Sequence, residues 1–292
     1  MSTRSQDEAI TWRVMWEETA LVVGGRAEAR WLCEEASGAF GSEFAEVLNE
    51  PATERTLAHL DAMLARWRAG EPLQYVLGHW SFRRLDLMVD ARVLIPRPET
   101  ELVVETALEL AGAMIGEPPL RCADLGTGSG AIGLSLAFEM PRGTVEVWLT
   151  DVSADALDVA RANAAGLGIA GAGVRFGHGS WFAALPAELK GTFGIIVSNP
   201  PYIATGDPEV DAVVHQWEPA GALYAGADGL DAVRAIGEGA LEWLAPGGRL
   251  VLEIGARQGR AAVDLLASAG LTDVEVRADL AGRDRIIVAT KR

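Results

Sequence analysis

From residue 119 to residue 289, short apolar segments typical of buried strands alternate with longer segments of helical periodicity. Strands separated by helices form a parallel sheet with helices on both faces, so this pattern predicts a doubly wound, seven-stranded α/β domain. The last two strands are joined by a turn too short for a helical crossover, and we expect them to pair antiparallel. The expected strands are 120–125, 144–150, 173–177, 194–198, 248–254, 274–277 and 285–289.

The residues before this domain have a different character. Residues 1–70 carry helical spacing and no strand pattern, which predicts a small helical bundle. Residues 71–98 hold short extended runs and end at Pro96 and Pro98, which indicates a linker with a hairpin. The α/β domain is therefore expected to cover residues 99–292, beginning with a helix.

Composition narrows the classes of protein that remain open. The 292 residues are 49% hydrophobic and 23% charged, which favours a packed core over disorder. A net charge of -16 disfavours non-specific binding to nucleic-acid phosphates. There is no long apolar run, no signal-peptide pattern and no disulfide framework, so we expect a cytoplasmic protein with no membrane partner. We also expect a monomer with no direct nucleic-acid partner, although the sequence does not give the oligomeric state. The four histidines are scattered, which predicts no metal site.

A glycine-rich loop follows the first expected strand and precedes a helix. Glycine lets the backbone turn sharply and approach a ligand closely, while a helix N-terminus presents free N–H groups. The loop therefore predicts a nucleotide-like ligand. Because Gly128, Gly130 and Gly133 also satisfy the dinucleotide spacing, a nicotinamide enzyme stays open at this point, as does a tight turn without a ligand. The loop reads Gly126-Thr127-Gly128-Ser129-Gly130.

Asp151 ends the second expected strand. An acid at this place can accept both ribose hydroxyls of an adenosine, which would complete the site that the glycine loop begins. The alternative is a cap on the following helix, for which Ser153 is the other candidate. We favour the ribose interpretation.

The fourth expected strand runs into Asn199-Pro200-Pro201-Tyr202. It should lie beside the first strand, so that Asn199 faces the ligand of the glycine loop. The Asn199 side-chain oxygen and the Pro200 carbonyl can accept both N–H bonds of a planar NH2 group, while the prolines stiffen the backbone and Tyr202 packs on the flat amide. Such positioning lowers a barrier by about 7–11 kcal/mol, against about 1 kcal/mol for one hydrogen bond. These residues predict methyl transfer from a sulfonium to a planar nitrogen.

The Asp-Leu-Gly-Thr-Gly-Ser-Gly run at 124–130, together with Asn-Pro-Pro-Tyr, resembles the class I methyltransferases that act on planar nitrogen. That group includes DNA adenine N6-methyltransferases. Three further stretches, at 72–78, 94–101 and 218–230, make residues 70–292 similar to the release factor glutamine-N5 methyltransferases.

This resemblance implies a class I S-adenosylmethionine methyltransferase (Rossmann-like) fold, with a small N-terminal helical domain that helps to grip the partner. It implies S-adenosylmethionine as the cofactor, contacted by Gly126–Gly130, Asp151 and Asn199. It places Trp181 near the adenine, although this residue is equally well interpreted as a core aromatic. It also implies that Asn199–Tyr202 bind the glutamine in the Gly-Gly-Gln loop of class 1 peptide chain release factors.

Some alternatives remain open. Arg97 and Glu99 either touch the substrate loop or form a charge pair at a helix start. A ribosomal-protein glutamine methyltransferase would share the chemistry, but the Pro-Arg-Pro-Glu-Thr-Glu run at 96–101 argues against it. The net charge argues against a DNA or RNA adenine N6-methyltransferase. The intact donor and acceptor motifs argue against a non-catalytic module that binds translation factors.

Overall fold

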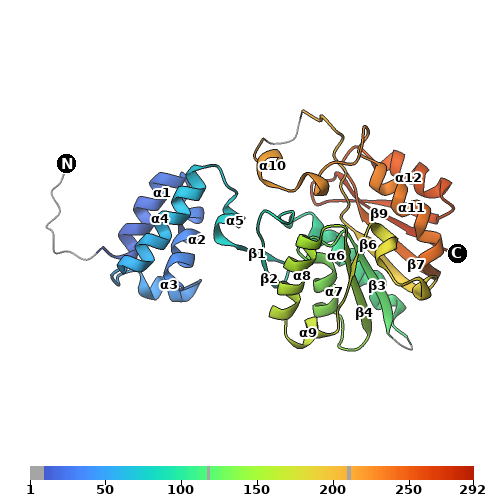
Figure 1. The fold of residues 1–292 in the computed structure, drawn as a ribbon, viewed down its shortest axis with the longest axis horizontal. Coiled ribbons are helices and arrows are strands. Elements are labelled where there is room, and N and C mark those ends of the chain that lie inside the picture. The colour runs from blue at the N-terminus through green and yellow to red at the C-terminus, as the bar shows by residue number, and fades with distance from the viewer. Residues whose placement is uncertain (1–9, 117–118, 209–211) are drawn as a thin grey trace. The chain divides into compact units, whose positions relative to one another are not determined.

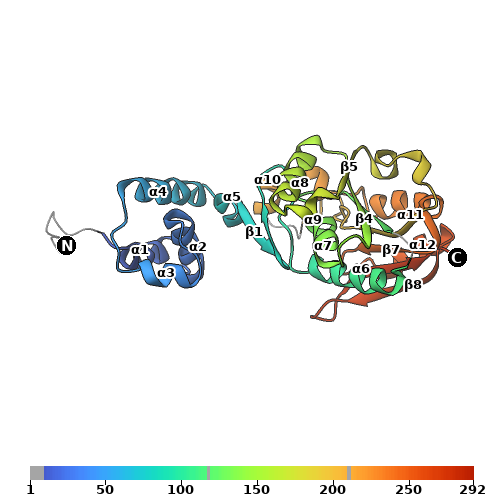
Figure 2. The ribbon, with the colours of Figure 1, turned by 90° about the horizontal axis from the view of Figure 1, so that it is seen from below.

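The computed structural model describes residues 10–116, 119–208 and 212–292. The chain divides into two compact units, Met1–Gly78 and His79–Arg292 (Figures 1 and 2). No helix in these described ranges is long and apolar enough to cross a membrane.

Helices make up the described part of the first unit. Gly24 and Gly38 end two of them with φ values of 78° and 73°, a left-handed conformation that glycine adopts without strain. Phe44 fills the centre, with Trp12 and Trp16 packed edge-on against its ring. The helices are α1 (Trp12–Val23), α2 (Arg26–Ser37), α3 (Ser42–Val47), α4 (Glu54–Arg68) and α5 (Leu73–Leu77).

A short helix, α5, lies where the sequence pattern predicted only extended runs. Its apolar side chains are all buried, which favours a compact turn over an extended strand. Arg66 near the end of α4 donates hydrogen bonds to the Tyr75 and Val76 carbonyls at 2.7 and 3.1 Å, and its guanidinium also pairs with Glu71. These bonds hold α5 against the end of α4.

The second unit opens with a hairpin, β1 (His79–Phe82) and β2 (Leu85–Met88), and contains a seven-stranded sheet in the order β5-β4-β3-β6-β7-β9-β8. β8 and β9 pair antiparallel with each other, and β9 pairs antiparallel with β7, whereas the remaining pairs are parallel. The predicted doubly wound fold and its antiparallel last pair are confirmed. The strands are β3 (Leu120–Leu125), β4 (Val145–Asp151), β5 (Arg175–His178), β6 (Phe193–Ser198), β7 (Leu244–Glu253), β8 (Thr272–Ala278) and β9 (Asp284–Thr290).

Helices cover both faces of the sheet (Figure 1). One face packs against α6 (Thr100–Met114), α7 (Ala131–Glu139) and α8 (Ala154–Gly166), and the other against α11 (Asp231–Trp243) and α12 (Gly259–Ser268). Every residue of β6 is buried, because its side chains alternate between the two hydrophobic cores. This double burial explains the continuous apolar run before Asn199. The remaining helices are α9 (Ile169–Ala172) and α10 (Ala212–Trp217), with single 3₁₀ turns at Trp181–Ala184, Ala187–Leu189 and Ala220–Ala222.

β3 lies between β4 and β6, as the sequence predicted. The chain moves outward from β3 to β4 and β5, and then crosses back to place β6 on the other side of β3. Ligands of doubly wound sheets bind outside the carboxyl ends of the strands at such a reversal. The glycine loop after β3, Asp151 at the end of β4 and Asn199 after β6 therefore meet at one edge.

Candidate active site

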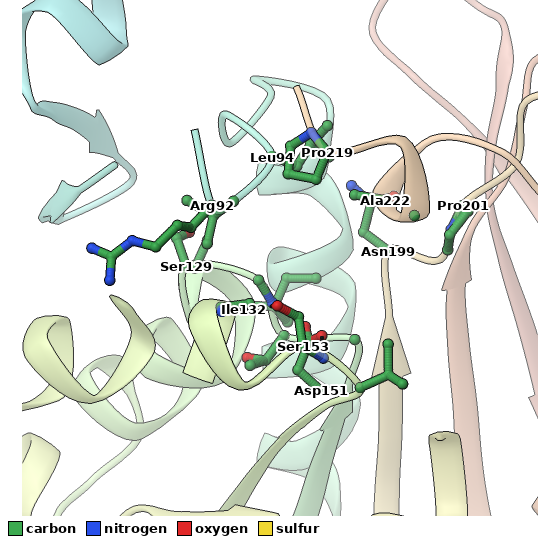
Figure 3. A pocket seen from close by; sticks show the side chains of 18 of the residues that line it. Arg92, Leu94, Ser129, Ile132, Asp151, Ser153, Asn199, Pro201, Pro219 and Ala222 are labelled. Carbon is green, nitrogen blue, oxygen red and sulfur yellow. Dashed lines mark hydrogen bonds between the residues drawn. The ribbon is translucent and has the colours of Figure 1, made fainter. Parts of the chain in front are cut away.

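A cavity of about 250 Å³ lies at this edge of the sheet. Figure 3 shows Asp151, Ser153 and Ile132 on one side of it, and Asn199 and Pro201 on the other. Residues far apart in the sequence thus share one space. Of the residues that the sequence singled out, the cavity is lined by Gly126, Thr127, Gly128, Ser129, Asp151, Trp181, Asn199 and Pro201.

Gly130, Pro200 and Tyr202 are not among the lining residues. Gly130 has a φ of 88° and precedes α7, and a Cβ there would lie 2.8 Å from Leu134 of the same helix, so glycine suits this helix start. Pro200 is buried. Burial, with a smaller contribution from the charge of Glu253 at the end of β7, raises the pKa of Tyr202 to about 12.

Asp151 holds the glycine loop and the start of α8 together. Its Oδ2 accepts the Gly128 N–H and its Oδ1 accepts the Ser153 N–H, both at 2.9 Å. Ser153 is the cap of α8, because its hydroxyl accepts the Ala156 N–H at 3.2 Å. An ionised carboxylate has about four acceptor sites, so Asp151 retains the capacity to bind two further donors at the cavity.

Asp124 lies beneath the glycine loop and is fully buried. Its Oδ2 accepts the Thr127 hydroxyl at 2.6 Å and the Gly133 N–H at 2.9 Å, whereas Oδ1 has no hydrogen-bond partner among the described residues. Burial raises the pKa of Asp124 to about 7. The two hydrogen bonds oppose this rise, and the nearby charge of Asp151 adds to it.

We expect Asp124→Asn to reduce the pH dependence of thermal stability. The pKa of Asp124 is higher in the folded protein than in the unfolded chain, so stability falls as the pH rises from about 4 to about 7. Asparagine does not titrate, yet keeps an oxygen for Thr127 and Gly133. Between pH 5 and pH 8, the wild-type melting temperature should fall by about 5 °C more than that of the variant. Equal falls in melting temperature for the wild type and Asp124→Asn would contradict this prediction. The control is Asp155→Asn, a substitution of an exposed acid in α8.

Trp181 stands in a strained conformation at the wall of the cavity. Its φ is 46°, which is rare for a bulky residue and marks positions that the surrounding structure constrains. The indole lies beside the glycine loop, because a Cβ on Gly126 would come within 3.5 Å of it. Trp181 also packs against the core around Phe182 and Trp243, so it has both a core contact and a cavity contact.

Sequence reasoning missed Asn163, which fixes the glycine loop from below. The Asn163 side chain, in α8, donates to the Ser129 carbonyl at 2.8 Å and to the Met88 carbonyl at 3.1 Å, and it accepts the Met88 N–H at 2.7 Å. It therefore ties the loop to strand β2. The sequence feature that could have indicated Asn163 is a polar residue on the apolar face of a helix, since a buried amide needs hydrogen-bond partners.

Thr100 and Glu253 were also missed as site residues, although Thr100 contacts Asn199 and Glu253 contacts Thr100. The Asn199 Nδ2 donates to the Thr100 hydroxyl at 3.1 Å, and this hydroxyl donates to Glu253 Oε2 at 2.7 Å. Burial raises the pKa of Glu253 to about 7; Thr100, Arg285 and Tyr202 oppose the rise, and Glu99 adds to it. The sequence feature that could have indicated Glu253 is a single acid within the apolar run 250–254.

The two charges near Pro96 and Pro98 have separate partners. Arg97 forms an ion pair with the buried carboxylate of Glu218, which also accepts the Ile95 N–H at 3.2 Å. The Glu99 Oε1 lies 3.5 Å from the Arg283 Nη2. Arg97 thus ties the segment before α6 to the segment around Pro219, and both segments contribute to the cavity wall.

Within the parts of the chain that the structure describes, no group of three or more His, Cys, Asp or Glu residues could hold a metal ion. The arrangement instead offers a carboxylate for hydroxyl groups, a close backbone approach at the glycine loop, and a side-chain amide opposite. These residues suit an adenosine-containing ligand.

Comparison with known proteins gives two family matches. Residues 108–221 match the family described as the methyltransferase small domain, and residues 20–78 match the PrmC N-terminal domain. The first match contains the glycine loop and Asn199, and the second lies in the helical unit.

The chain is also similar to curated proteins over most of its length. It is 44% identical over 261 residues to the release factor glutamine methyltransferase of Burkholderia pseudomallei, covering 88% of this chain and 89% of that protein. The protein of the same description from Moorella thermoacetica is 47% identical over 229 residues, covering 78% and 77%. A methyltransferase structure from Pyrococcus furiosus, at 18% identity and a TM-score of 0.52, covers 79% of this chain and 98% of that one, which supports the fold alone.

Proposed function

The chain belongs to the family of release factor glutamine methyltransferases, and from this premise we propose that it methylates the side-chain amide nitrogen of a glutamine in a peptide chain release factor. The target is the glutamine of the Gly-Gly-Gln loop of class 1 release factors, and the products are N5-methylglutamine, S-adenosylhomocysteine and the proton that the amide nitrogen releases. S-adenosylmethionine is the cofactor. The observation that carries the proposal is that Asn199 lines the same cavity as Asp151 and the glycine loop.

S-adenosylmethionine supplies a methyl group on a sulfonium, an electrophile that needs an aligned nucleophile more than a strong base. The residues of the cavity fit such a ligand. Asp151 retains acceptor capacity for the ribose hydroxyls, Gly128 leaves open space where a side chain would stand, and the Trp181 indole offers a flat surface.

Asn199 and its neighbours act on the glutamine amide. An amide nitrogen is a weak nucleophile because its lone pair is delocalised into the carbonyl. The Asn199 oxygen and the Pro200 carbonyl accept its two N–H bonds, which fixes the plane of the amide and directs the nitrogen at the methyl group. Pro201, which lines the cavity, stiffens this turn, and Tyr202 packs on the amide plane.

The first unit gives the enzyme a second contact with its partner. Residues 20–78 match the PrmC N-terminal domain, and we assign release-factor docking to this helical unit. Release factors act in the cytoplasm, and the enzyme works there on the protein alone, without a direct nucleic-acid contact.

Incubating the purified chain with methyl-labelled S-adenosylmethionine and a class 1 release factor tests the proposal. We expect label on the release factor, and peptide mass spectrometry should place one methyl group on the Gly-Gly-Gln glutamine. A release factor in which that glutamine is replaced by alanine should stay unlabelled.

The same assay separates the other candidate functions. Label that appears only on ribosomal protein would identify a ribosomal-protein glutamine methyltransferase. Label only on DNA or RNA would identify an adenine methyltransferase. Binding of the release factor with no transfer to any of these substrates would indicate a non-catalytic module.

A further inference from the structure

Three side chains from separate elements form a hydrogen-bonded chain that ends at Asn199. The Asn199 NH2 donates to Thr100, the first residue of α6, and the Thr100 hydroxyl donates to Glu253, the last residue of β7. Thr100 and Glu253 are 3% and 1% exposed, so bulk water does not compete for the hydrogen bond between them. These hydrogen bonds lead from the interior to the cavity wall, where Thr100 and Asn199 both lie.

The protons of these three hydrogen-bonded side chains have one arrangement when Glu253 is ionised. A carboxylate only accepts hydrogen bonds and a threonine hydroxyl has a single proton, so that proton lies on the bond to Glu253. The Thr100 oxygen is then left as an acceptor, which binds the NH2 of Asn199 and not its oxygen. The proton count therefore determines which end of the Asn199 amide faces Thr100.

We propose that Thr100 and Glu253 are positioning residues that hold the Asn199 amide with its oxygen toward the substrate, a role that rests on the proposed function of this site. Rotated by half a turn, the same amide would present its NH2 to the NH2 of the substrate. Two donors form no hydrogen bond, so the target nitrogen would lose one of its two acceptors.

The burial of Glu253 argues for more than packing. This acid ends the buried run of β7 and is followed by Ile254, which is fully buried. In the described ranges, its Oε1 has no hydrogen-bond partner. Burying a carboxylate with an unsatisfied oxygen lowers stability, so a strand end shaped by packing alone would carry an apolar residue here.

The first test needs no release factor. The chain has three asparagines, so selective nitrogen-15 labelling gives three side-chain NH2 groups in an NMR spectrum. The Asn199 NH2 proton on the bond to Thr100 should exchange with water slowly in the wild type and at least about tenfold faster in Thr100→Val, while Thr100→Ser keeps the slow rate. Exposed Asn49 and buried Asn163 are the fast and slow references. Equal exchange at Asn199 in wild type and Thr100→Val would overturn the proposal.

The second test is a kinetic double-mutant cycle at pH 8. Thr100→Val should lower kcat about 10- to 30-fold with cofactor affinity within about twofold, and Thr100→Ser should stay within about threefold of wild type. In an Asn199→Ala background, Thr100→Val should have no further effect, because the amide that Thr100 positions is gone. A purely structural role would lower kcat equally in both backgrounds, and that result would refute positioning.

Glu253 is tested by a matched pair. Glu253→Ala removes the acceptor and should behave like Thr100→Val in both experiments. Glu253→Gln keeps an oxygen that can accept the Thr100 hydroxyl, so it should retain most of the activity; similar losses in both variants would remove Glu253 from the proposal. If the wild-type enzyme does not label a release factor, the proposed function fails, whereas the exchange experiment still decides the role of Thr100.

Discussion

Asn199→Ala should lower kcat for methyl transfer to a release factor by about a thousandfold, while the affinity for S-adenosylmethionine stays within about threefold. The Asn199 side chain is one of two acceptors for the target NH2, and without it the amide can rotate away from the methyl group. The expected loss exceeds the value of one hydrogen bond, about 1 kcal/mol, because orientation of the nucleophile is lost as well.

Calorimetry for the cofactor and steady-state labelling for transfer measure these two quantities separately. Thr205→Ala is the matched control, since this exposed residue lies on the same loop after β6 and outside the cavity lining. Its kcat should equal that of the wild type. Near-normal transfer by Asn199→Ala would show that the Asn199 amide does not hold the substrate.

Asp151→Ala should weaken binding of S-adenosylmethionine about a hundredfold. The substitution removes the acceptor proposed for the ribose hydroxyls, and hydrogen bonds to a charged group contribute about 1.5–3 kcal/mol each. It also releases the Gly128 N–H, which the carboxylate now holds at 2.9 Å, so the glycine loop loses part of its support.

Asp155→Ala serves as the control for Asp151→Ala. Asp155 is an exposed acid in the first turn of α8, four residues from Asp151, so its removal changes the charge of the chain equally. Calorimetric titration should give the wild-type affinity for this control. If Asp151→Ala also bound the cofactor like the wild type, the carboxylate would have only a local structural role.

The alternation of strands and helices was predictable because it rests on local spacing. Strands buried on both faces, such as β6, give continuous apolar runs, and the segments between them show helical periodicity. The antiparallel pairing of β8 and β9 was predictable from the short connection alone. The helix α5 was not, because its burial depends on contacts with the end of α4.

The motif residues of the site could be predicted for a similar reason. The glycine loop and Asn199 follow directly after strands and Asp151 ends one, and the carboxyl ends of parallel strands lie at one edge of the sheet. The supporting residues could not be predicted in this way. Asn163 sits in the middle of a helix and Thr100 at the start of another, and neither belongs to a motif.

The sequence by itself determined the alternation of strands and helices in the second unit, the doubly wound sheet, and the meeting of the glycine loop, Asp151 and Asn199 at one edge, since all of these follow from local pattern and strand direction. Only the tertiary structure decided that Thr100 and Glu253 lie behind Asn199, that Asn163 supports Ser129, and that Arg97 pairs with Glu218 instead of Glu99. Each of these contacts joins residues on different elements. Their side chains meet through the packing of helices on the sheet, which no short stretch of sequence records.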